Sequence, residues 1–157
     1  MSAEQPGAAD GPLRGPPLNP SVRPRMETDG SSVDMSNVVS PGNIAAALTE
    51  HWSPRVVAEL DDSFVKVAKL HGSLTWHSHD NEDELFYVLK GSLRIEMQDR
   101  TVELRQGDAF VVPKGVRHNP VAEQECHVML IERKTTLHTG TEITDRTRTL
   151  AEQLRPV

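Results

Sequence analysis

The sequence contains only one cysteine, Cys126, so no disulfide can form within the chain. No motif around this residue would lower the pKa of its thiol, and we expect it to pack as a small buried side chain. The sequence also lacks any run of about 20 apolar residues, the length that a membrane-spanning helix needs, and its first thirty residues contain no apolar signal core. We therefore expect a cytoplasmic protein with no membrane partner.

Clustered positive charge is absent as well. The formal net charge is −6, the sequence pI is about 5.6, and no group of Lys and Arg residues is interleaved with aromatic residues. A nucleic-acid groove needs such a group to neutralise phosphates. The composition therefore predicts no nucleic-acid partner.

The 157 residues, 36% of them hydrophobic, can form one domain with a core. The first part of the chain is rich in Pro, Gly, Ser and Ala and buries too little apolar surface to offset its ordering entropy. We expect a disordered arm over residues 1–40 and a folded domain over residues 41–157. The run Pro16-Pro-Leu-Asn-Pro20 also has the polyproline character of a docking segment.

The folded part begins with a short helix and continues as strands. Helix formers follow Ser40-Pro41, which predicts a short helix before Trp52. Tight-turn dipeptides then separate segments rich in β-forming residues, and no long helices alternate with them. This pattern predicts an all-β domain with a closed or sandwiched antiparallel sheet. The expected strands are 55–60, 64–70, 84–89, 93–98, 101–104, 109–112 and 126–132, followed by a weak helix signal over 145–154.

Two motifs supply a set of metal ligands. The first reads His77-x-His79-x4-Glu84-x6-Gly91, and the second reads Gly107-x5-Pro113-x-Gly115-x2-His118. Side chains two residues apart on extended backbone leave the same face, so His77 and His79 can converge on one ion. Glu84 opens the next strand, and His118 follows a turn farther along the chain. Three imidazoles and one carboxylate suit a divalent transition ion such as Mn, Fe, Ni or Zn.

These motifs resemble the two signature motifs of the cupin superfamily, in particular the small single-domain cupins similar to mannose-6-phosphate isomerase. The resemblance covers about residues 52–134. It implies a double-stranded β-helix, or jelly roll, with the metal inside one end of the barrel. It also places His77, His79, Glu84 and His118 at the ligand positions and implies a homodimer.

Four protein ligands leave two positions of an octahedral shell for water or substrate. Three neutral histidines and one carboxylate leave a divalent ion with residual positive charge, which favours a small anionic ligand rich in oxygen. We therefore expect a metal-dependent enzyme, an oxidoreductase, isomerase or decarboxylase, whose substrate the sequence does not name. The alternatives are a non-catalytic module that binds or senses a small ligand, and a barrel in which the metal is only structural.

Several other residues have less distinctive patterns. We expect His51, His71 and His138 to be ordinary surface or core residues, and the acidic residues Asp80, Glu82 and Asp83 to form a solvated loop. The alternatives for this loop are that it deters anionic ligands or supplies a hydrogen bond to a ligand histidine. Strand alternation puts either Cys126, Val128 and Leu130 or His127, Met129 and Ile131 inside the barrel, and the sequence does not decide between them. The apolar candidates for the wall around the metal, or for the barrel core, are Phe64, Val67, Phe86, Val88, Phe110 and Val112.

Overall fold

The structure is a computed structural model that describes residues 38–157. The expected disordered arm and its polyproline run lie outside the described residues, apart from the last three positions of the arm. No helix in the described part of the chain is long and apolar enough to span a bilayer.

The described chain is mostly antiparallel strand, as the turn and strand pattern predicts. Helix α1 covers Pro41–Ala47, with Pro41 in the first turn, where its missing N–H costs no hydrogen bond. A four-residue helix, α2, covers Leu150–Gln153 near the end of the chain. The strands are β1 (Arg55–Leu60), β2 (Ser63–Ser73), β3 (Glu84–Lys90), β4 (Ser92–Met97), β5 (Thr101–Arg105), β6 (Ala109–Val112) and β7 (His118–Arg133).

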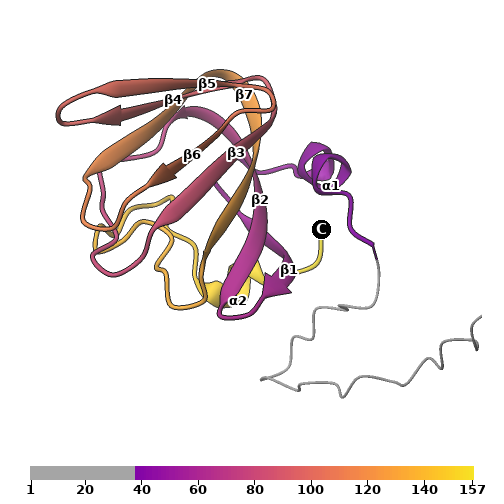
Figure 1. Ribbon diagram of the computed structural model, residues 1–157. Coiled ribbons are helices and arrows are strands. Elements are labelled where there is room, and N and C mark those ends of the chain that lie inside the picture. Colours follow the sequence, from indigo (N-terminus) through magenta and orange to yellow (C-terminus); the bar gives the residue numbers. More distant parts are fainter. Residues whose placement is uncertain (1–37) are drawn as a thin grey trace, which may run out of the picture.

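One seven-stranded sheet closes into a jelly-roll barrel around the long strand β7. The strand order is β1-β2-β7-β3-β6, and β4 joins β5 to β7. The second half of β7 pairs with β3, and its first half pairs with β4, so β7 belongs to both sides of the barrel. Figure 1 shows the β4–β5 hairpin at the end of the barrel opposite β1 and α2.

The first half of β7 is the largest difference from the predicted strands. The sequence pattern predicts a strand from Cys126, whereas β7 begins at His118. Residues 118–125 read as a loop because they include Pro120 and several polar residues. Pairing with β4 and with the end of β2 holds them extended, and the Pro120 carbonyl accepts a hydrogen bond from the Leu74 N–H.

The structure decides which face of β7 points inward. Cys126, Val128 and Leu130 are buried in the main core cluster, together with Phe86, Val88 and Val112. Burial also raises the pKa of the Cys126 thiol to about 12, so this thiol is a packing group. His127 lies on the other face, where its Nε2 is 3.1 Å from the Glu125 carboxylate.

Helix α1 covers the outer face of the sheet beside β2 and β3 (Figure 1). Ala45 and Leu48 form a second apolar cluster there with Val57 and Val67. The inclusion of Val67 among the candidates for the metal pocket or barrel core is therefore wrong. Its neighbours Lys66 and Ala68 point inward instead, because side chains alternate along a strand.

Candidate metal centre

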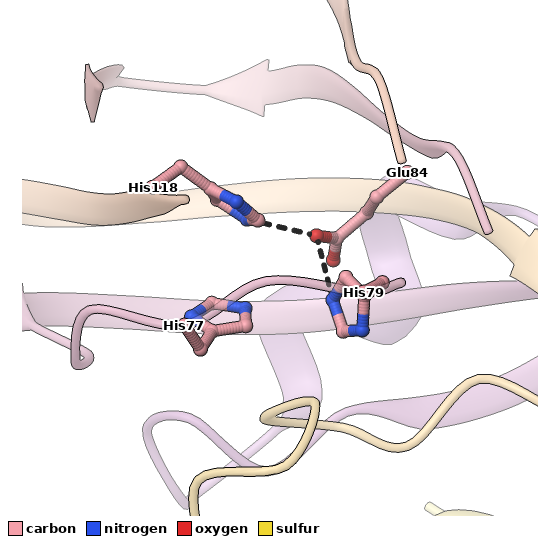
Figure 2. Close-up of side chains that lie close together, drawn as sticks. All are labelled: His77, His79, Glu84 and His118. Carbon is pink, nitrogen blue, oxygen red and sulfur yellow. Dashed lines mark hydrogen bonds and ion pairs between the residues drawn. The ribbon is translucent and has the colours of Figure 1, made fainter. Parts of the chain in front are cut away.

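The four residues of the two motifs lie together at one end of the barrel (Figure 2). His77 and His79 lie in the loop between β2 and β3, Glu84 is the first residue of β3, and His118 is the first residue of β7. All four side chains are buried, and one ligand-type atom from each lies within 4.8 Å of those from the others.

Backbone hydrogen bonds fix the loops that carry the histidines. His77 and His118 form an isolated antiparallel bridge, in which each N–H donates to the carbonyl of the other residue at 3.0 and 2.9 Å. The Gly115 N–H donates to the His79 carbonyl at 2.7 Å. The turn of the second motif is therefore bonded directly to the histidine loop of the first.

Two side chains of the acidic loop support this arrangement. The Asp83 carboxylate accepts a hydrogen bond from the Lys114 N–H at 2.8 Å. The Glu82 carboxylate accepts a hydrogen bond from the Thr135 hydroxyl at 2.9 Å. The Asp83–Lys114 bond thus ties the acidic loop, for which a solvated loop was the main expectation, to the turn of the second motif.

Hydrogen bonds to backbone carbonyls orient two of the imidazoles. The Nδ1 of His77 lies 3.0 Å from the Thr75 carbonyl, and the Nδ1 of His118 lies 3.0 Å from the Val116 carbonyl. A carbonyl can only accept, so each Nδ1 carries a proton. In the neutral ring Nε2 is then an unprotonated lone pair, the form that binds metals.

The Glu84 carboxylate lies between two imidazoles. Its Oε2 is 3.2 Å from the Nε2 of His118 and 3.3 Å from the Nε2 of His79. A carboxylate oxygen facing the lone pair of a neutral imidazole places two acceptors together, so a cation is required between them, either a proton or a metal ion. Burial works to raise the pKa of Glu84, but its close contacts with the His118 and His79 imidazoles outweigh burial and hold this pKa well below its ordinary value.

The histidines differ in how readily they take up a proton. Burial lowers the pKa of His77 to about 4, although the Glu84 charge opposes this effect. Burial also acts to lower the pKa of His79, but its contact with Glu84 outweighs burial and the pKa is raised. Without a metal ion, His77 is therefore neutral at neutral pH, whereas the Glu84 carboxylate favours the protonated form of His79.

The donor set fits a divalent transition-metal ion. It offers three imidazole nitrogens and one carboxylate, none of which is a thiolate. The buried Nε2 of His79 is also without an aligned hydrogen-bond partner among residues 38–157, in spite of its closeness to Glu84. Such an orphaned atom is costly unless something binds it, and a metal ion in the centre of the group would do so.

A mostly apolar cavity adjoins two of the four residues. Its free volume is about 20 Å³, which is room for about one water molecule. His77 and Glu84 line it, together with Trp52, Phe86 and His138. Of the six apolar candidates from the sequence, Phe86 lies in the cavity wall, Val88 and Val112 belong to the core, and Phe110 packs against the core. Phe64 is buried but belongs to neither apolar cluster and does not line the cavity.

Sequence reasoning missed two features of this end of the barrel. His138, expected to be an ordinary histidine, is half-buried in the cavity wall, and burial lowers its pKa to about 4. The other feature is an ion pair inside the barrel between Lys66 and Glu132. The available signal for this pair was strand alternation, which puts Lys66 on the same face as Ala68 and Leu70.

His51 and His71 are exposed, as expected.

A jelly-roll barrel with three buried histidines and a glutamate at one end defines the class of this protein. Residues 63–132 match the family described as Cupin domain. A solved structure of a cupin-2 domain protein from Shewanella frigidimarina is 40% identical with a TM-score of 0.60, and the match covers 62% of this chain and 95% of that one. The chain therefore belongs to the cupin family.

Two curated relatives are also similar to part of this chain. An uncharacterized protein of Bacillus subtilis, YdbB, is 37% identical over 76 residues, which are 48% of this chain and 67% of that protein. The 3-hydroxyanthranilate 3,4-dioxygenase of Brucella anthropi is 32% identical over 76 residues, which are 45% of this chain and 42% of the enzyme. The chain thus spans less than half the length of this dioxygenase.

Proposed function

We propose that the protein is an enzyme that holds one divalent transition-metal ion through His77, His79, Glu84 and His118. The observation that carries this proposal is the convergence of these four buried side chains, with the Nδ1 protons of His77 and His118 turned away to backbone carbonyls. A cluster that binds no cation would not place unprotonated nitrogens against a carboxylate, so this arrangement supports metal binding.

The residues around the site favour a small oxygen-rich anion as substrate. When bound, a divalent ion would act as a Lewis acid toward substrate oxygens, and Fe or Mn would add redox chemistry. Three neutral imidazoles and one carboxylate neutralise only half of its charge, so an anionic oxygen ligand completes the balance. The apolar wall formed by Trp52, Phe86 and Leu130 would exclude water from such a ligand.

Within this class, we propose an oxidoreductase that consumes dioxygen. Support comes from curated relatives named 3-hydroxyanthranilate 3,4-dioxygenase, which match 39–45% of this chain at 32–34% identity. Those matches cover no more than 42% of each relative, so they support the type of reaction more than the choice of substrate.

The test begins with untagged protein and elemental analysis. Metal-free protein is then loaded in turn with Mn, Fe, Ni and Zn, and oxygen uptake is recorded with 2-oxo acids, dicarboxylates, enediols and 3-hydroxyanthranilate. The proposal predicts one ion per chain and oxygen uptake with Fe or Mn but not with Zn. Tight ligand binding without any turnover would favour the non-catalytic module instead.

The homodimer stays a prediction, as do the cytoplasmic location and the absence of a nucleic-acid partner. The strands β1 and β6 form two ends of the sheet and carry the exposed apolar residues Leu60 and Val111. An uncovered sheet edge is a natural place for a second chain to pair. Light scattering after size-exclusion chromatography would give the mass of the particle.

A further inference from the structure

His138 lines the cavity beside His77 and Glu84 but stands outside the four-residue group. It comes from the C-terminal segment, defined here as residues 136–149, which follows β7 and runs mainly through turns to α2. Its position raises the question of what an additional imidazole does next to a site that already has three.

The proton of His138 is on the nitrogen opposite to that of His77 and His118. The Arg148 backbone N–H donates to the Nδ1 of His138 at 3.1 Å, so Nδ1 is an acceptor. A neutral ring then carries its proton on Nε2. His77 and His118 thus offer lone pairs at Nε2, whereas His138 offers an N–H donor. In the described part of the chain, the bond from Arg148 is the one hydrogen bond that the His138 side chain makes, so its Nε2–H has no protein partner there.

The hydrogen-bond donor to His138 is itself held in place. The Arg148 carbonyl accepts a bond from the Gln153 side-chain amide at 2.9 Å. The next residue, Thr149, caps α2 through a reciprocal pair of bonds with Glu152. The tautomer of His138 is therefore set by a backbone group fixed at the start of a capped helix.

The C-terminal segment also packs directly on the metal-site loop. Gly140 has φ +57°, and a Cβ there would lie 2.0 Å from the carbonyl oxygen of Ser78, the residue between His77 and His79. The Arg146 guanidinium donates to the Ser73 carbonyl and lies 5.9 Å from the centre of the Trp52 ring. The segment that carries His138 is thus in close contact with the residues that carry the proposed ligands.

We propose that His138 is a ligand-binding residue of this pocket, whose Nε2–H donates a hydrogen bond to an oxygen of the small anion held at the metal. The inference rests on the proposed function and adds a residue that selects for an acceptor at this position. A free volume of about 20 Å³ admits one water, so a larger ligand has to displace part of the wall. His138 is the wall residue that comes from the C-terminal segment, and its bond to the ligand would hold this segment against the ligand.

The test uses the full chain loaded with Ni²⁺ and 4-nitrocatechol as the probe, a bidentate oxygen ligand whose absorption changes on binding. His138→Leu removes the donor, His138→Gln keeps a side-chain N–H, and His71→Leu removes an exposed imidazole as the matched control. All variants should bind one Ni²⁺ per chain. Affinity for the probe should fall about tenfold to a hundredfold in His138→Leu, fall less in His138→Gln and stay unchanged in His71→Leu.

Nitrogen NMR of the wild-type imidazoles gives a second readout, which should place the His138 proton on Nε2. Unchanged probe affinity in His138→Leu, or loss of Ni²⁺ from that variant, would overturn the inference and leave the proposed function standing. Wild-type protein that binds no metal would overturn both. If His138→Leu does not fold, His138→Gln becomes the deciding variant. Because its amide keeps an N–H donor, a probe affinity of Ni²⁺-loaded His138→Gln as low as that of metal-free protein would contradict hydrogen-bond donation by this side chain.

Discussion

The Nζ of Lys66 lies 2.5 Å from the Oε1 of Glu132, and both side chains are buried inside the barrel. Glu132 lies on β7, next to the strand that begins with Glu84, and the Glu84 charge contributes to raising its pKa. The metal-site end of the barrel therefore holds two buried carboxylates and one buried ammonium group. A divalent ion among them would leave this interior with a net positive charge.

Replacing one partner of this ion pair should destabilise the fold more than replacing both partners. We expect Lys66→Met to lower the free energy of unfolding by roughly 3–5 kcal/mol near pH 8, because it leaves the Glu132 carboxylate buried without a cation. Lys66→Met combined with Glu132→Leu should recover most of that loss. Urea unfolding of the two variants and the wild type measures both effects.

The loss in Lys66→Met should shrink in acid. Burial raises the pKa of Glu132 to about 7, well above its value in the unfolded chain, and Lys66 opposes that rise. A carboxyl with a raised folded pKa is protonated more readily in the folded state, so the penalty for its burial appears as the pH rises and disappears as it falls. An equal loss at pH 5.5 and pH 8 would argue against a buried, unpaired Glu132.

Glu84→Gln should keep the barrel folded but weaken metal binding. The amide lacks the charge that balances a divalent ion, so the affinity should fall by more than the roughly 10–100-fold typical of losing an outer-shell partner. Asp80→Asn is the matched control, because Asp80 is an exposed acidic residue of the same loop. Isothermal titration with Ni²⁺ compares the three proteins, and equal affinities for Glu84→Gln and wild type would remove Glu84 from the ligand set.

As the pH falls, protonation of His79 should weaken metal binding before protonation of His77 does. The raised pKa of His79 means that an incoming ion displaces a proton from it, so the logarithm of the association constant should rise with pH until His79 is deprotonated. His77, with a pKa lowered to about 4, should compete with the metal only in stronger acid. Titration in buffers of different ionisation enthalpy counts the protons released. Affinity that is constant between pH 5 and 7 would contradict this scheme.

Gly140→Ala should loosen the C-terminal segment from the metal-site loop. A Cβ at Gly140 would meet the Ser78 carbonyl. Gly72 has a similar positive φ, +77°, but a Cβ there would have open space around it. Gly72→Ala therefore measures backbone strain alone, about 1–3 kcal/mol, and Gly140→Ala should cost more. Limited proteolysis within residues 136–149 should increase only in Gly140→Ala. Equal stability and cleavage in the two variants would show that the close packing has no effect.

The sequence predicts most of this fold because alternation and turns are local signals. The strands at 55–60 and 109–112 match the structure at both ends, and α1 lies in the stretch before Trp52 where a short helix is predicted. The first half of β7 could not be recognised in this way, since its polar and proline residues are held extended by β2 and β4, which are distant in sequence. Val67 was wrongly placed among the pocket or core candidates, and the buried Lys66 was missed, for a related reason. Alternation along a strand defines two faces but does not say which face points inward.

The four site residues could be predicted because both motifs are compact, and each carries its own glycine or proline turns. His138 could not, since its role depends on the fold of the C-terminal segment, on the Arg148 N–H and on the contact between Gly140 and Ser78. No spacing rule links it to the two motifs. Contacts between distant segments determine which of several similar histidines faces the cavity.

The most direct test of the metal centre is anomalous diffraction from crystals of the full chain grown with a divalent transition metal. We predict one anomalous peak per chain, bonded to the side chains of His77, His79, Glu84 and His118. A peak elsewhere, or an empty position between these four side chains in metal-saturated crystals, would contradict the account.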